Sequence, residues 1–245
     1  MTEMIHENLI RTYIAITKYN MIYIIMPLMS YGDLSLVMSF KYPDGITDEV
    51  AISTIMRDCL KALECLNKNN FFHRDIKAAN ILLASDGSCR LGDYGVSTVI
   101  KKKGGNDSYV GSLCWMAPEI AQGMEYDYKV DIWSLGITAI EIANGKPPFI
   151  GLSPFEYTKT VLNDAEPQLV DSKHVWSQEF KDFVKSCLIK DPRKRPSAAE
   201  ILQMNKKFFE KAKDKNYILQ TILSGVPTIQ ERVRFYIIFY TILVS

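Results

Sequence analysis

The sequence predicts an α+β domain in which helices outweigh strands, and three observations lead to this. Two stretches rich in β-branched and apolar residues, 10–17 and 21–26, stand near the start of the chain. A second pair of short strands is expected over Ile81–Leu83 and Cys89–Leu91. After residue 117 the chain reads as helices and loops. A few strands followed by many helices is typical of an α+β domain whose mass is mostly helical.

The strands are expected to form two hairpins. Residues 18–20 separate the first two stretches, which therefore read as antiparallel neighbours. Residues 30–33 then interrupt the strand pattern. In the second pair Asp86-Gly87 supplies the turn, because this dipeptide is favoured in tight hairpins.

The helices differ in how much of their surface is apolar. From residue 48 apolar side chains recur at helical spacing, which predicts a long helix with one apolar face. We expect Thr47 to cap its N-terminus. The stretch 130–143 is apolar on nearly every side, which predicts a helix buried in the centre of the domain. Further amphipathic helices are expected over 180–188 and 197–204.

The composition argues against several classes of protein. Lys and Arg number 29 against 28 Asp and Glu, so we expect neither nucleic acid nor an anionic membrane as the main partner. The five cysteines are scattered without a C-x-x-C pair, which predicts reduced thiols in the cytoplasm rather than a disulfide framework or a zinc site. The apolar stretch 235–244 is shorter than the roughly 20 residues that a membrane-spanning helix needs.

Three motifs carry residue types suited to chemistry. The first is His73-Arg-Asp-Ile-Lys-Ala-Ala-Asn80, the second is Asp93-Tyr-Gly95, and the third is Gly111-Ser-Leu-Cys-Trp-Met-Ala-Pro-Glu119. Each string alone has an ordinary structural explanation, such as a salt bridge at a helix end, a turn or chance. Their order and spacing, followed by the apolar helix that begins Asp131-Ile-Trp-Ser-Leu-Gly136, favour a shared function.

Together the motifs resemble those of eukaryotic serine/threonine protein kinases, over residues from about 6 to about 233. The resemblance implies that Asp75 accepts or orients the proton of the attacking hydroxyl, and that Lys77 faces the transferring phosphate. It also implies that Asn80 and Asp93 hold Mg²⁺. Tyr94 stands where the family has Phe, which removes no catalytic group.

The same resemblance implies a set of supporting residues. Glu119, at the end of the A-P-E motif, is expected to pair with Arg195. Asp131 is expected to bond the backbone of the catalytic loop, in which His73 has a structural role.

The nucleotide contacts follow from the likeness of residues 23–29 to the fifth strand and hinge of a kinase. Met26 would lie behind the adenine, and backbone groups of Pro27 and Met29 would bond the base. Pro27 lacks an N–H, but the family uses the carbonyl at that position. Asp33 is expected at the ribose and Leu82 under the adenine. Plain core packing is the alternative for Met26 and Leu82.

The chain most resembles one branch of these kinases. Residues 111–119 and 132–141 are similar to Sterile-20-like kinases, and residues 208–216 and 226–232 to the oxidative-stress-responsive, Fray-like group within them. In that group a separate C-terminal domain selects partners.

The resemblance also implies regulation by phosphorylation. Ser108 is expected to be phosphorylated by an upstream activating kinase, and Arg74 to clamp the phosphate. Ser112 would lie near Asp75 and Lys77. The alternative for Ser108 is an ordinary solvated loop serine.

We expect three parts along the chain. Residues 1–29 are read as a remnant of the kinase N-lobe, comprising the end of a helix, two strands and the hinge. Residues 30–210 form the helical C-lobe, and residues 211–245 an extension with an apolar tail. The Gly-rich loop and strand lysine that a kinase places before the hinge are missing from the sequence, which predicts a truncated N-terminus.

Two functions therefore stay open. The first is a protein serine/threonine kinase that uses ATP and Mg²⁺ on protein substrates, favoured because Asp75, Lys77, Asn80 and Asp93 are all present. The second is a non-catalytic binding module or scaffold, favoured by the missing strand lysine. Stabilisation by Mg²⁺-ATP would distinguish the two.

Overall fold

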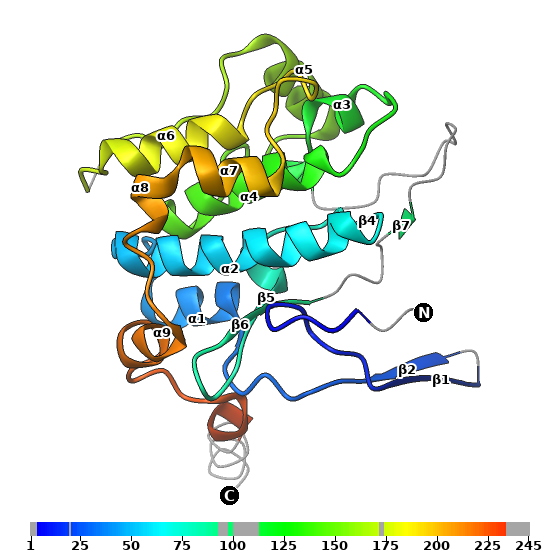
Figure 1. Cartoon of the computed structure of the whole chain (residues 1–245), viewed down its shortest axis with the longest axis vertical. Coiled ribbons are helices and arrows are strands. Elements are labelled where there is room, and N and C mark those ends of the chain that lie inside the picture. The colour runs from blue at the N-terminus through cyan, green and yellow to red at the C-terminus, as the bar shows by residue number, and fades with distance from the viewer. Residues whose placement is uncertain (1–3, 20, 93–97, 100–112, 172–173, 234–245) are drawn as a thin grey trace, which may run out of the picture.

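The computed structural model describes residues 4–19, 21–92, 98–99, 113–171 and 174–233 (Figure 1). The strands are β1 (Ile14–Lys18), β2 (Met21–Ile25), β3 (Gly32–Asp33), β4 (Phe71–Phe72), β5 (Ile81–Leu83), β6 (Cys89–Leu91) and β7 (Thr98–Val99). The helices are α1 (Leu34–Lys41), α2 (Glu49–Lys68), α3 (Pro118–Ala121), α4 (Lys129–Asn144), α5 (Pro154–Asn163), α6 (Gln178–Cys187), α7 (Ala198–Met204), α8 (Lys206–Phe209) and α9 (Lys215–Thr221). The α+β prediction with a helical majority is confirmed.

The centre of the molecule is α4, which is buried from Val130 to Ala143 as its apolar sequence predicted. It packs between α2 on one side and α6 on the other. At Gly136 an added Cβ would lie 2.7 Å from the Cβ of Cys187, so only glycine allows α4 and α6 to approach this closely. The helix ends at Gly145, whose φ of +77° suits a residue without a side chain.

The long amphipathic helix is α2, and its cap differs from the prediction. Asp48, not Thr47, is the N-cap: its Oδ1 accepts hydrogen bonds from the N–H groups of Val50 at 2.9 Å and Ala51 at 3.1 Å. Helical geometry starts at Glu49, so Thr47 stands one residue too early to reach these donors. Helices α6 and α7 lie where the sequence predicted amphipathic helices.

The first hairpin, β1–β2, is confirmed, with Ile14 opposite Ile25. It projects away from the helical body (Figure 1). Its apolar side chains are exposed on both faces, because Ile14, Ile16, Ile24 and Ile25 keep between 45% and 50% of their surface in water.

The second hairpin, β5–β6, is also confirmed, with Ile81 opposite Leu91. The third strand of this sheet, β3, was not predicted; it pairs with β5 and sets Asp33 opposite Leu82. A strand of two residues carries no readable periodicity. This pairing fixes the start of α1 beside the β5–β6 hairpin.

Beyond α8 the chain packs back on the first helices. Ile218, Ile222, Leu223 and Val226 are buried. The Nζ of Lys41, at the end of α1, donates to the main-chain oxygens of Thr221 at 3.0 Å and Ser224 at 2.6 Å. In Figure 1 this part of the chain, orange to red, lies against α1 and the β5–β6 turn. Among the described residues, no helix combines the length and the apolar character needed to cross a membrane.

Candidate active site

The loop that carries His73 to Asn80 is attached to the first turn of α4. The carboxylate of Asp131 accepts the N–H of His73 at Oδ2 and the N–H of Arg74 at Oδ1, both at 2.7 Å. These bonds turn the chain sharply, and Arg74 takes a left-handed φ of +74°. Asp131 is 1% exposed, and this burial raises its pKa to about 7, although the two backbone bonds oppose the shift.

Within this loop, three predicted catalytic side chains meet. The Nζ of Lys77 lies 2.7 Å from Asp75 Oδ2. The Nδ2 of Asn80 donates to the same Oδ2 at 2.9 Å and to the main-chain oxygen of Asp75 at 2.6 Å. A cation and an amide therefore hold one carboxylate oxygen of Asp75 in a fixed position.

The orientation of Asn80 bears on metal binding. Both hydrogen bonds of its side chain use the nitrogen, and its Oδ1 accepts no hydrogen bond from any described residue. An amide oxygen of this kind suits Mg²⁺, which takes few protein ligands and completes its shell with water and phosphate oxygens. No cluster of three or more His, Cys, Asp or Glu side chains that could hold a metal is found in the described ranges. The residues present therefore fit a site of one or two protein oxygens.

The predicted second metal ligand, Asp93, lies outside the described residues, as do Ser108 and Ser112. Gly92, the residue before Asp93, is held by two hydrogen bonds. The N–H of Gly92 donates to the main-chain oxygen of Asn80 at 2.9 Å, and Nε2 of His73 lies 2.8 Å from the oxygen of Gly92. Because Nδ1 of His73 accepts the N–H of Asp75 at 3.3 Å, Nε2 carries the proton and donates it to Gly92. His73 thus ties the loop to the strand that precedes residue 93.

Three further residues of α4, which the sequence did not reveal, bind this loop or the stretch before the A-P-E motif. Thr138 Oγ1 donates to the oxygen of Ile76 at 3.3 Å, and Ser134 Oγ to the oxygen of Trp115 at 2.7 Å. With Asp131 and Glu141, these residues are spaced by three and four positions and so share one face of the helix. Polar residues at that spacing in an otherwise apolar helix were the signal that could have revealed them.

Glu141 joins two separate segments through one oxygen. Its Oε2 accepts the N–H of Ala78 at 3.0 Å and the indole Nε1–H of Trp115 at 2.9 Å. Burial raises the pKa of this carboxyl to about 7, while the two hydrogen bonds and the charge of Lys77 act in the opposite direction. The catalytic loop and the stretch before the A-P-E motif are therefore held at a common point.

Glu119 and Arg195, predicted to pair, form an ion pair inside the protein. Arg195 Nη1 lies 2.6 Å from Glu119 Oε1, and Nη2 lies 3.0 Å from Oε2. Arg195 is 0% and Glu119 2% exposed. The guanidinium also donates to the main-chain oxygens of Lys129, Ile189 and Lys190, so its donors find partners without water.

The residues predicted at the nucleotide are brought together only in part. Asp33 and Leu82 face each other across β3 and β5, and an added Cβ at Gly92 would lie 2.5 Å from Leu82 Cδ1. Asp33 Oδ1 also accepts the N–H of Leu36 at 2.8 Å and so caps α1.

The other three residues lie along the connection from β2. Met29 is buried, Pro27 is half-buried, and Met26, 42% exposed, is not a core residue.

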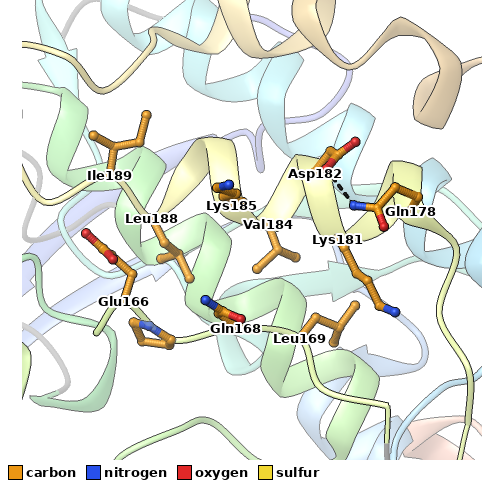
Figure 2. A pocket seen from close by; sticks show the side chains of 11 residues that line it. Glu166, Gln168, Leu169, Gln178, Lys181, Asp182, Val184, Lys185, Leu188 and Ile189 are labelled. Carbon is orange, nitrogen blue, oxygen red and sulfur yellow. Dashed lines mark hydrogen bonds between the residues drawn. The ribbon is translucent and has the colours of Figure 1, made fainter. Parts of the chain in front are cut away.

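A cavity of about 380 Å³ lies elsewhere, between residues 166–169 and α6. Figure 2 shows the apolar side chains of Leu169, Val184 and Leu188 at this hollow, with Lys181 and Gln178 beside them. None of the residues predicted to carry chemistry lines it. The candidate active site is therefore the group around Asp75, away from this cavity.

Comparison with known proteins shows the family of the chain. Residues 1–209 match the protein kinase domain family. Serine/threonine-protein kinase fray2 of Dictyostelium discoideum is 40% identical over 230 residues, which cover 93% of this chain and 22% of the relative. Fray1 of the same organism is 40% identical over 233 residues, which cover 94% of this chain and 40% of the relative.

Germinal center kinase 3 of Caenorhabditis elegans is 36% identical over 251 residues, covering 94% of this chain and 42% of the relative. The chain thus spans between 22% and 42% of the length of these three curated relatives. The match over residues 1–209 and the identity to these relatives show that the chain belongs to the protein kinase family, with serine/threonine kinases as its relatives.

Proposed function

We propose that this chain carries the catalytic lobe of a serine/threonine protein kinase, which transfers the γ-phosphate of ATP to serine or threonine hydroxyls of proteins. The observation that carries the proposal is the arrangement of Lys77 and Asn80 around one oxygen of Asp75. A carboxylate next to a cation and an amide oxygen is the combination that phosphoryl transfer requires.

Each residue has a distinct role in the proposed reaction. Asp75 orients the attacking hydroxyl and accepts its proton. The ammonium group of Lys77 stabilises negative charge on the transferring phosphoryl group. Asn80, together with Asp93, would hold Mg²⁺, which neutralises phosphate charge when it is bound.

The nucleotide is proposed to lie along the hinge. Backbone groups of Pro27 and Met29 would bond the base, Met26 would lie behind it, and Asp33 and Leu82 would contact the ribose and the adenine. The position of Leu82 beside Gly92 supports this, because it sets the proposed adenine floor next to the residue that precedes Asp93.

Regulation and organisation are proposed from the family resemblance. Phosphorylation of Ser108 by an upstream kinase would add a charge that Arg74 can pair, and Ser112 would pack near Asp75. The proposed parts are 1–29, 30–210 and 211–245, and the proposed compartment is the cytoplasm.

The test is Asp75→Asn in the full-length protein, with transfer of labelled phosphate from ATP to a protein acceptor as the readout. We expect the rate to fall by about 10²–10⁴, the range for loss of a general base. The urea midpoint of unfolding is the control, and it should stay close to that of the wild type because asparagine has the same shape.

Binding of Mg²⁺-ATP is measured alongside. At 100 times Kd it should stabilise the wild-type protein by about 2.7 kcal/mol. Transfer that survives Asp75→Asn unchanged would contradict the proposal. No stabilisation of the wild-type protein by Mg²⁺-ATP would favour a binding module instead.

A further inference from the structure

The segment 226–232 lies against residues 30–31, which connect the hinge to β3, and it follows the residues 1–209 that match the protein kinase domain family. The N–H of Ile229 donates to the main-chain oxygen of Ser30 at 2.8 Å. The Nη2 of Arg232 donates to the main-chain oxygen of Tyr31 at 3.2 Å. Two residues of the extension therefore bind two consecutive carbonyl groups directly after the hinge.

The same stretch is also held by β5 and by a turn of its own. The N–H of Tyr31 donates to the oxygen of Leu83 at 3.1 Å, and the N–H of Gly32 donates to the oxygen of Met29 at 2.9 Å. Residues 29–32 are thus fixed between β5 and the extension. These residues connect Met29 to Asp33, two of the proposed nucleotide contacts.

The close approach of the two segments depends on Gly32. Its φ is +79°, and an added Cβ would lie 3.4 Å from Ile229 Cδ1 and 3.3 Å from Leu36 Cδ2. The side chain of Ile229 therefore rests on a glycine α-carbon, where an ordinary residue would be crowded and strained.

Local hydrogen bonds stabilise the segment 226–232 of the extension. A helix begins at Ile229, and Thr228 and Glu231 form a reciprocal cap: Thr228 N–H and Oγ1–H both donate to Glu231 Oε2, at 2.7 and 2.8 Å, and Thr228 Oγ1 accepts the N–H of Glu231 at 3.3 Å. Arg232 Nε donates to the oxygen of Pro227 at 2.9 Å. Arg232 thus joins the turn of the extension to the hinge with one guanidinium.

We propose that residues 226–232 are a positioning element for nucleotide binding, which holds the hinge backbone in the conformation that binds ATP. This rests on the proposed kinase function. A hinge released from the extension would populate its binding conformation less, and the apparent Kd would rise by the inverse of that population.

The experiment uses Arg232→Ala and Ile229→Pro in the full-length protein. Proline is tolerated at the first position of a helix, so Ile229→Pro removes the N–H that binds Ser30 without interrupting the helix. Mg²⁺-ADP is titrated calorimetrically, and KM is measured separately for ATP and for a protein acceptor. Arg232→Lys is the conservative variant, because it keeps a charged donor.

The matched control is Lys215→Ala. Lys215 is in the same extension and binds Asp86 at 2.6 Å in the β5–β6 turn, but it does not contact the hinge. We expect Arg232→Ala to raise the Kd for Mg²⁺-ADP and the KM for ATP by about tenfold, the size of one lost hydrogen bond from a charged donor. The KM for the protein acceptor should not change, and Arg232→Lys should recover part of the loss.

If both Arg232→Ala and Ile229→Pro bind Mg²⁺-ADP within twofold of the wild-type affinity, the inference is overturned while the proposed kinase function stands. The same holds if Lys215→Ala loses as much nucleotide affinity as Arg232→Ala. An equal rise in both KM values would also overturn it, because that indicates general loosening of the fold. A wild-type protein that binds no Mg²⁺-ADP would overturn the proposed kinase function and this inference with it.

Discussion

Replacing Arg195 by methionine tests how the end of the A-P-E motif is held. The substitution removes a guanidinium that is 0% exposed and leaves the carboxylate of Glu119 buried without a cation. It also removes the donors to three main-chain oxygens, those of Lys129, Ile189 and Lys190. Both losses lower the free energy of unfolding.

The expected magnitude follows from the burial. Breaking one partner out of a buried ion pair costs about 3–5 kcal/mol, a large share of the roughly 5–15 kcal/mol that stabilises a typical protein. For a chain of this size such a loss lowers Tm by roughly 6–20 °C. The loss of folding free energy is measured by equilibrium unfolding in urea, followed by tryptophan fluorescence. It appears as a lower urea midpoint at an unchanged m-value.

The double variant Glu119→Met with Arg195→Met decides whether the two residues act as a pair. An apolar pair leaves no uncompensated charge, so the double variant should be more stable than either single variant. It should remain below wild type by about 1–3 kcal/mol, because the carbonyl groups still lack donors. Destabilisation equal to the sum of the two single variants would refute the reasoning.

Three further predictions concern other buried groups. Glu141→Gln should change the pH dependence of stability: the native pKa of about 7 lies above the unfolded value, so the wild-type contribution is complete below pH 4.5 and is lost as pH rises through 7. Urea unfolding should show that the wild-type protein loses up to about 3 kcal/mol of stability relative to Glu141→Gln as the pH rises from 4.5 to 8. A stability difference that stays constant with pH would contradict this. Gly136→Ala should destabilise by about 1–3 kcal/mol by urea unfolding, because overpacking against Cys187 outweighs the roughly 1 kcal/mol gain in helix propensity; a gain would contradict the packing. In native protein an alkylating reagent followed by mass spectrometry should modify only the half-buried thiols of Cys65 and Cys114, because the thiols of Cys59, Cys89 and Cys187 are buried out of reach of the reagent; modification of a buried thiol in the native protein would contradict this.

Local sequence signals predicted the parts of the molecule that depend on neighbouring residues. The turn at Asp86-Gly87 correctly located β5 and β6, and the apolar stretch 130–143 correctly located α4. Asp75, Lys77 and Asn80 are close in sequence, so their meeting follows from one short loop. The roles assigned to these three residues stay predictions until transfer is measured.

The features that were missed depend on residues far apart in the chain. Nothing near Ile229 in the sequence points to Ser30, because the contact joins residues at opposite ends of the chain. Glu141 was read as one more position of an apolar helix, since its partner Trp115 lies on a different segment. Helix α5 carried a local signal in its capping box, Ser153 and Glu156, that the analysis of periodicity did not use.

The exposed isoleucines of β1 and β2 make protein concentration a variable in every one of these measurements. Apolar surface gains about 25 cal/mol for each Å² removed from water. Among the described residues β1 and β2 pair only with each other, so the edges of this ribbon can accept a strand of another chain. Two molecules that meet at this ribbon would raise the apparent stability of both without any change in the catalytic loop. Titrations repeated over a dilution series separate that self-association from the behaviour of the single molecule.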